Sequence, residues 1–247
     1  MKAFGKTDTG IVRKNNEDTI FYKSYDDELK NLCIVADGMG GHNAGEIASR
    51  SAIEYFLEYF NDKYEKGEFD NILYLMADAV TLSNAEVYKN SFKDDAYKGM
   101  GTTFLATVNY KGVLNVCHIG DSRLYVYRNE ELKQITEDHA LVTDLIKRGE
   151  ITEEEARVHP NRNVITRSLG TSENVLVDTY EIDIEDDDIF IMCSDGLNTM
   201  LDDERIKRIV AGEESIEAMV ESLIVEAKFE GGFDNVSVII MRNEVDK

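Results

Sequence analysis

The sequence has few of the features that divide a chain into separate parts. Its 247 residues include a single proline, Pro160, and they show no Pro-rich linker, no Ser/Gly-rich linker and no internal repeat. The hydrophobic fraction of 43% is enough for a well-developed core. We therefore expect residues 1–247 to form one continuous domain.

Cysteine is also scarce. Cys33, Cys117 and Cys193 each lie inside an apolar run, and no C-x-x-C spacing occurs. This pattern argues against a disulfide framework and a thiolate metal site. The N-terminus has no apolar signal core, and no apolar run approaches the roughly 18 residues of a membrane span. A reducing, cytoplasmic setting is expected.

Positive charge is the third deficit. The chain has 27 Lys and Arg against 49 Asp and Glu, which gives a formal net charge of −22 at pH 7. Such a surface repels nucleic-acid phosphates and anionic lipid headgroups, so neither is an expected partner. Most of the carboxylates serve solubility, and a minority must serve another purpose.

The hydrophobic pattern indicates short strands and paired helices. Strands are predicted over the following ranges: 19–23, 31–36, 102–110, 113–119, 123–128, 174–182, 188–193 and 235–241. Helical spacing marks Ile53 to Phe60, Ile72 to Val87, and a weaker pair over 203–210 and 214–228. Hairpin turns are predicted at Lys111-Gly112 and Asn129-Glu130. Strands joined by hairpins, with helices in separate blocks, favour an α+β fold with two mainly antiparallel sheets packed face to face and helix pairs outside.

Acidic residues stand at the ends of these predicted strands. Asp37, Asp121 and Asp195 follow apolar runs, whereas Asp234 and the pair Glu17-Asp18 precede them. In antiparallel sheets the exits of some strands and the entries of others share one edge, so these carboxylates could converge. An Asp-Gly pair alone is usually only a turn. Gathered carboxylates repel one another unless a cation lies between them, and oxygen ligands alone select Mg²⁺ or Mn²⁺.

Two neighbouring segments extend this hypothesis. The segment DGMGGHNAGE (37–46) can bend beside Asp37 and expose the Gly38 carbonyl to a cation. A nucleotide loop is the poorer interpretation, because no Lys-Ser/Thr follows and no G-x-G-x-x-G spacing is present. Arg13 could hold a phosphate in bidentate fashion, or it could form an ordinary surface ion pair. The residues alone leave these two alternatives open.

Eight motifs in order resemble the metal-dependent type 2C serine/threonine protein phosphatases. They are RKNNED (13–18), ADGMGGHNAGE (36–46), GMGTTF (99–104), HIGDSRLY (118–125), TEDHALV (136–142), NVITRSLG (163–170), CSDGLNTML (193–201) and GGFDNVSVI (231–239). The resemblance covers essentially the whole chain, and the DGMGGH form is similar to the bacterial branch. Ala140 and Asn198 depart from the family's usual residues, but neither is a predicted ligand.

The resemblance implies a four-layer α/β/β/α sandwich with a metal cluster at one edge. In the implied site, Asp37 bridges two metal ions, and Asp195 and Asp234 complete the ligands of the first ion. The Gly38 carbonyl binds the second ion, and Glu17 contacts that ion through a water molecule. Asp18 orients bound waters, Asn235 braces Asp234, and Asp121 and Asp195 hold a third, weaker ion. Arg13 would bind the substrate phosphate.

The expected reaction is hydrolysis of phosphoserine and phosphothreonine in proteins, a signalling activity. A hydroxide bridging two Mn²⁺ or Mg²⁺ ions would attack phosphorus in line, and His42 would protonate the leaving oxygen. The other histidines are expected to do less: His118 to pack in a strand, and His139 and His159 to be solvated or capping. Residues 138–165 correspond to the family's variable flap and are expected to influence substrate choice.

Two other functions fit the sequence less well. A catalytically inactive relative acting as a binding module usually lacks a metal aspartate, yet Asp37, Asp195 and Asp234 are all present. A two-metal nuclease or other phosphodiesterase is opposed by the negative charge and the lack of a basic groove. The expected partners are phosphorylated proteins, including a Ser/Thr kinase and its substrates. Nothing in the sequence points to an oligomer, so a monomer is expected.

Overall fold

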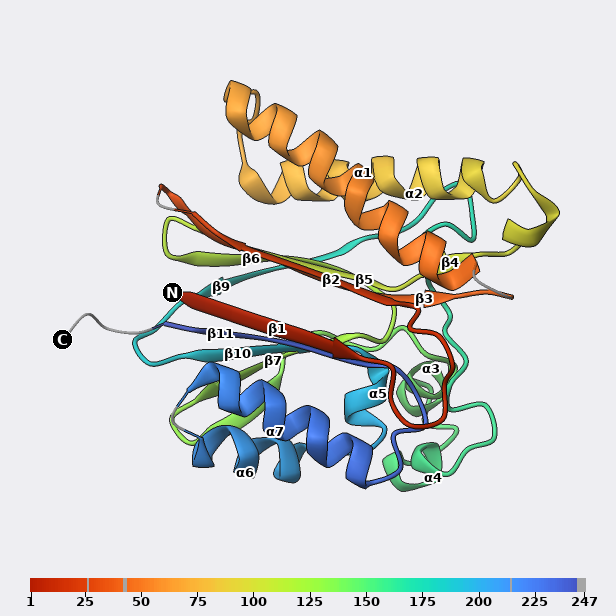
Figure 1. The fold of residues 1–247 in the computed structure, drawn as a ribbon, viewed down its shortest axis with the longest axis vertical. Helices are drawn as coiled ribbons and strands as arrows, with labels where there is room; N and C mark the ends of the chain where they lie inside the picture. The colour runs from red at the N-terminus through yellow and green to blue at the C-terminus, as the bar shows by residue number, and fades with distance from the viewer. Residues whose placement is uncertain (26, 42–43, 214, 244–247) are drawn as a thin grey trace.

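The structure is a computed structural model that describes residues 1–25, 27–41, 44–213 and 215–243. Two antiparallel sheets face each other (Figure 1). The five-stranded sheet has the order β1 (Lys2–Asp8), β11 (Val236–Arg242), β10 (Ile189–Cys193), β7 (Arg123–Arg128), β8 (Glu131–Gln134). The six-stranded sheet has the order β2 (Asp18–Ser24), β3 (Leu29–Met39), β5 (Phe104–Tyr110), β6 (Val113–Ile119), β9 (Asp178–Asp183), with β4 (Gly101–Thr102) paired to β3.

Helix pairs cover the outer faces of both sheets (Figure 1). Helices α1 (Ala44–Lys66) and α2 (Ile72–Asn90) lie on the six-stranded sheet, and α6 (Asp203–Gly212) and α7 (Ile216–Phe229) lie on the five-stranded sheet. The short helices are η1 (Asp95–Tyr97), α3 (Leu141–Lys147), α4 (Glu153–Arg157) and α5 (Asp195–Asn198). Side-chain caps fix several helix starts; for example, Asn71 accepts hydrogen bonds from the first-turn amides of α2. None of the helices in the described ranges has both the length and the hydrophobicity needed to cross a membrane.

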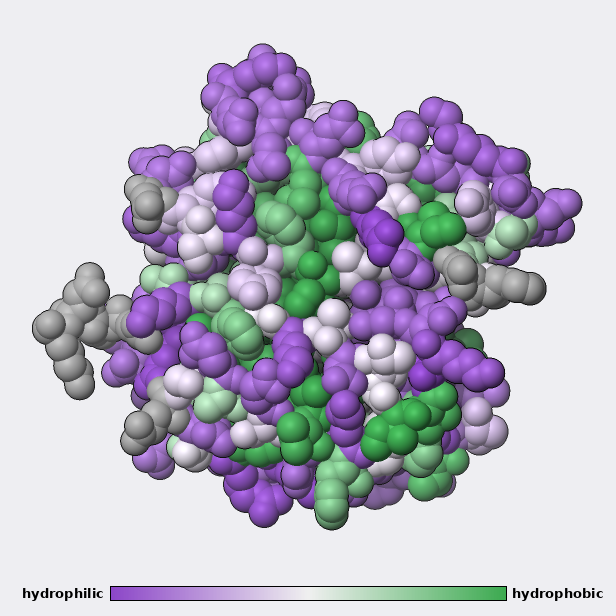
Figure 2. Space-filling view, viewed as in Figure 1, coloured by the Kyte–Doolittle hydropathy of each residue, from purple (hydrophilic) through white to green (hydrophobic). Residues whose placement is uncertain are grey.

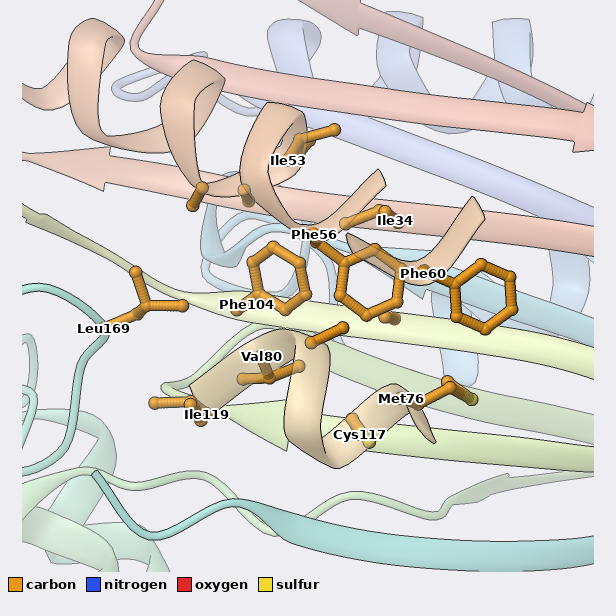
Figure 3. Packing of buried hydrophobic residues seen from close by; sticks show 14 of the residues in the cluster. Ile34, Ile53, Phe56, Phe60, Met76, Val80, Phe104, Cys117, Ile119 and Leu169 are labelled. Carbon is orange, nitrogen blue, oxygen red and sulfur yellow. The ribbon is translucent and has the colours of Figure 1, made fainter. Parts of the chain in front are cut away.

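Three hydrophobic layers hold the sandwich together. Under α1 and α2, Phe56 stacks on Phe60 and contacts Phe104 of β5, with both pairs of ring centroids 5.5 Å apart (Figure 3). Side chains alternate along β5, so the neighbouring Leu105 points the other way, into the layer between the sheets. A third layer lies beneath α6 and α7. Helix, sheet, sheet and helix therefore form four layers, and the predicted fold class is confirmed.

The strand predictions differ from the structure mainly at the strand ends. Both predicted hairpins are present, with positive φ at both turn residues in each case. The edge strands β1 and β8 were not predicted, because their partly exposed faces give weak patterns. The predicted strand 102–110 is interrupted at Thr103, which exchanges hydrogen bonds with Asp37 instead. The predicted strand 174–182 begins only at Asp178.

Candidate metal centre

The strand ends bring the predicted acidic residues to one edge of the sandwich. Asp18 opens β2 and is the register partner of Asp37 in β3. Asp195 follows β10, Asp234 precedes the adjacent β11, and Asp121 follows β6. The charges of the other four aspartates all act on the carboxyl group of Asp37. The sequence-based prediction that these carboxylates converge is therefore correct. Asp37 lies inside β3, which continues to Met39, rather than just beyond the strand.

Close backbone approaches explain three glycines at this edge. A side-chain carbon on Gly38 would lie 2.0 Å from the carbonyl oxygen of Gly45, and one on Gly45 would lie 2.7 Å from that of Gly38. The start of α1 therefore packs directly on the segment that carries Asp37. At Gly196, an added side-chain carbon would lie 2.0 Å from the carbonyl oxygen of Asn235. That contact places the start of α5 against the start of β11, so Asp195 and Asp234 lie next to each other.

Asp18 is anchored by two serines that sequence reasoning missed. Its Oδ2 accepts hydrogen bonds from the hydroxyls of Ser194 at 2.7 Å and Ser237 at 2.6 Å. Its Oδ1 is buried and has no hydrogen-bond partner among the described residues. Burial raises the pKa of Asp18, and the negative charges of Asp195 and Asp234 raise it further.

Asp37, Asp121 and Asp195 share this electrostatic situation. One buried oxygen of Asp121 and one of Asp195 also lack a partner within the described part of the chain. Burial, followed by repulsion from neighbouring aspartates, raises the pKa of all three carboxyl groups. Positive charge is what this cluster needs to hold its carboxylates ionised.

Arg13 and Asp234 lie at the mouth of the cluster. An Arg13 guanidinium nitrogen donates to Asp234 Oδ2 at 2.8 Å, and the Asn235 amide donates to Asp234 Oδ1 at 2.9 Å. The bond to Asp234 raises the pKa of Arg13, and the charges of Glu17 and Asp37 add to the effect. Arg13 is largely exposed, so its remaining donors are accessible to a ligand.

Asn235 holds the loop that carries Glu17. Its side-chain oxygen accepts from the Glu17 amide at 2.8 Å, and its side-chain nitrogen donates to the carbonyls of Thr9 and Asn15 at 3.0 Å each. Burial raises the pKa of Glu17, although Arg13 opposes this shift. Asn235 therefore braces the Glu17 loop as well as Asp234.

A hard cation fits the donors at this edge. Over the described ranges the acidic side chains do not close into a ready-made ligand cage. However, partnerless buried carboxylate oxygens with raised pKa values indicate sites that a divalent cation would satisfy. Carboxylate and carbonyl oxygens suit Mg²⁺ and Mn²⁺. The individual ligand assignments remain predictions.

The histidines divide differently from the sequence-based expectation. His42 lies outside the described residues, so its predicted role as a proton donor remains a prediction. His139, expected to be solvated or capping, is buried: its Nδ1 accepts from the Gly120 amide at 2.9 Å and its Nε2 lies 3.0 Å from Asp178 Oδ2. It thereby holds the turn that leads to Asp121. His118 is fully buried beside it, with ring centroids 4.8 Å apart, and burial lowers its pKa to about 3.

A family model described as protein phosphatase 2C matches residues 12–227. The serine/threonine phosphatase stp of Listeria monocytogenes serotype 4b is 32% identical over 246 residues, which cover 99% of this chain and 97% of that relative. The serine/threonine phosphatase PstP/Ppp of Mycobacterium tuberculosis has a crystal structure with a TM-score of 0.88, 35% identity and 99% coverage of both chains. A structure of the PstP catalytic domain in complex with 2 manganese ions has a TM-score of 0.83 and 33% identity, covering 97% of this chain and 96% of that one. Since the family model spans most of the chain and the relatives match along nearly their whole length, this chain belongs to the protein phosphatase 2C family.

Proposed function

We propose that this protein removes phosphate from serine and threonine side chains of other proteins in a Mn²⁺- or Mg²⁺-dependent reaction. The observation that carries the proposal is the group of partnerless buried carboxylate oxygens of Asp18, Asp121 and Asp195 around Asp37, within the described part of the chain. Arg13 lies at the same edge, where it donates to Asp234. The relatives named as serine/threonine phosphatases support the same substrate class. They favour an active enzyme over an inactive binding module.

The chain's own residues have distinct proposed roles. Asp37, Asp195, Asp234 and the Gly38 carbonyl would hold two ions, with Glu17 acting through water and Asp18 orienting bound waters. Asp121 and Asp195 would hold a third, weaker ion. Bound metal supplies the positive charge that activates water and neutralises phosphoryl oxygens.

Arg13 is positioned to orient the substrate. Because a single nitrogen contacts Asp234, the rest of the guanidinium fork can donate to two phosphoryl oxygens. Asp37 would contribute to catalysis as a ligand that holds the metal ions. His42 would donate the proton that the leaving serine or threonine oxygen requires.

Several further assignments belong to this proposal. Residues 1–247 would act as one catalytic domain, and the 138–165 flap would influence substrate choice. Helices α3 and α4 of that flap lie at the same end of the sandwich as α5 (Figure 1). A cytoplasmic, monomeric protein acting opposite a Ser/Thr kinase is proposed. The three free, buried cysteines are consistent with a reducing compartment.

The test is hydrolysis of a phosphothreonine peptide with Mn²⁺, with excess EDTA, and by Asp37→Ala. We expect Mn²⁺-dependent turnover that both treatments abolish. Asp78→Ala, which changes an exposed aspartate of α2, is the matched control and should retain full turnover. Turnover that survives EDTA or Asp37→Ala would contradict the metal-dependent mechanism. Faster cleavage of a phosphodiester than of the phosphopeptide would favour the phosphodiesterase alternative.

A further inference from the structure

An apolar surface lies directly beside Arg13. Ile11, Val12, Phe229 and Phe233 are 62%, 58%, 80% and 60% exposed, and we call this group the apolar ledge. Figure 2 shows hydrophobic surface gathered near the C-terminal end of α7 and the loops beside it. Exposed apolar clusters of this kind commonly mark interaction sites, whereas isolated exposed apolar residues are ordinary.

Backbone hydrogen bonds hold the ledge in place. The amides of Ile11 and Val12 both donate to the carbonyl of Gly232, at 2.8 and 3.3 Å. The Gly232 amide donates to the carbonyl of Ala227 in α7. The ledge therefore joins two distant parts of the chain in a fixed arrangement. These backbone hydrogen bonds hold the segments that expose the ledge side chains.

Both parts of the ledge lead directly into the proposed phosphate site. Val12 precedes Arg13, and Phe233 precedes Asp234, to which Arg13 donates at 2.8 Å. Consecutive residues of an extended peptide are about 3.3–3.6 Å apart along the chain. The ledge is therefore within reach of side chains about one to three residues from a phosphorylated residue whose phosphate contacts Arg13.

We propose that the apolar ledge binds an aliphatic or aromatic side chain that flanks the phosphorylated residue of the substrate protein. This inference rests on the proposed phosphatase function and names its substrate class. Net charge supports the same occupant: a protein of charge −22 repels acidic flanking sequences, whereas an apolar contact adds attraction that this field does not oppose. The preferred substrates are phosphoserine or phosphothreonine segments with Leu, Ile, Val or Phe within three residues.

The test compares two phosphothreonine peptides that differ only in having Leu or Ser at the flanking positions. A small phosphomonoester, p-nitrophenyl phosphate, reports the metal chemistry without the ledge. We expect the unaltered enzyme to favour the Leu peptide by about tenfold in kcat/KM, mainly through KM, as burial of one apolar side chain implies. The double variant Val12→Ser/Phe233→Ser should reduce this preference to below about twofold, while hydrolysis of p-nitrophenyl phosphate is retained.

Phe229→Ser is a second variant that does not adjoin a predicted ligand in sequence, and it should lower the preference part of the way. Phe92→Ser is the matched control, because Phe92 is 72% exposed beyond the end of α2, outside the ledge, and should leave the preference unchanged. Equal kcat/KM for both peptides, or a preference for the Leu peptide that persists in the double variant, would overturn the proposal that the ledge binds substrate. A wild-type dimer in sedimentation that the double variant disrupts, without any peptide preference, would assign the ledge to a second copy and likewise overturn the proposal. Failure of the unaltered enzyme to hydrolyse p-nitrophenyl phosphate would instead count against the phosphatase function itself.

Discussion

Strand β10 has an aspartate just before it and another just after it, and the protein surrounds the two in opposite ways. Asp188, just before the strand, is fully buried and accepts two hydrogen bonds from Arg128, at 2.7 and 2.6 Å, and one from the Glu185 amide at 2.8 Å. Asp195, just after the strand, has a buried oxygen with no partner in the described ranges, and its main neighbours are other aspartates. Arg128 therefore neutralises the charge of Asp188, whereas the charge of Asp195 requires a bound cation to neutralise it.

The largest expected effect comes from Asp195→Asn. Loss of a ligand charge should lower phosphopeptide kcat/KM by about 1,000-fold or more at fixed Mn²⁺. The free energy of unfolding without metal should stay the same or rise, because the substitution removes a negative charge that neighbouring aspartates repel. Steady-state kinetics and urea denaturation in EDTA measure the two effects. A large loss of metal-free stability would show that Asp195 is structural, like Asp188.

The second-largest effect is expected from Arg13→Ala, which should lower phosphopeptide kcat/KM by about 100-fold. Because the ion pair with Asp234 is exposed, the free energy of unfolding should change by less than about 1 kcal/mol. Arg13→Lys restores the charge without the planar fork and should recover only part of the rate. Full recovery by lysine would indicate that charge alone matters at this position.

Asp188→Asn should show the reverse pattern. It breaks the pairing with Arg128, whose side chain is partly exposed, so the free energy of unfolding should fall by about 2–3 kcal/mol. The folded enzyme should retain its kcat. Asp186→Asn, a nearby exposed aspartate, is the control for both measurements. A drop in kcat with unchanged stability would contradict the claim that Asp188 is structural and Asp195 functional.

Stability in EDTA should also depend on pH. Folding raises the pKa to about 6 for Asp195, about 7 for Asp18 and about 8 for Asp121, mainly through burial. The folded state therefore binds more protons than the unfolded chain, so these groups destabilise the protein as pH rises from about 4 to about 8. Unfolding free energy should fall by on the order of a few kcal/mol over that window. Saturating Mn²⁺ should stabilise more at pH 8 than at pH 5.5, and an equal shift at both would contradict the assignment.

The sequence could predict much of this arrangement, because apolar runs such as 188–193 locate central strands and the acids stand at their ends. It could not show that Ser194 and Ser237 anchor Asp18, since those contacts join residues 176 and 219 positions apart. A polar residue within or next to an apolar strand was the only signal for them. His139 was misjudged for a similar reason, because its partner amide at Gly120 belongs to a different segment. The edge strands β1 and β8 could not be predicted, because half-exposed strands lack a strong hydrophobic pattern.

The most direct test is a calorimetric titration of the metal-free protein with Mn²⁺, beside Asp37→Asn and Asp188→Asn. If the carboxylates beside Arg13 form a divalent-cation site, the unaltered protein and Asp188→Asn should bind at least two ions. Asp37→Asn should lose at least one of them, since Asp37 is proposed to bridge the pair. Equal binding by the unaltered protein and Asp37→Asn, or no binding above that of exposed surface carboxylates, would contradict the metal site.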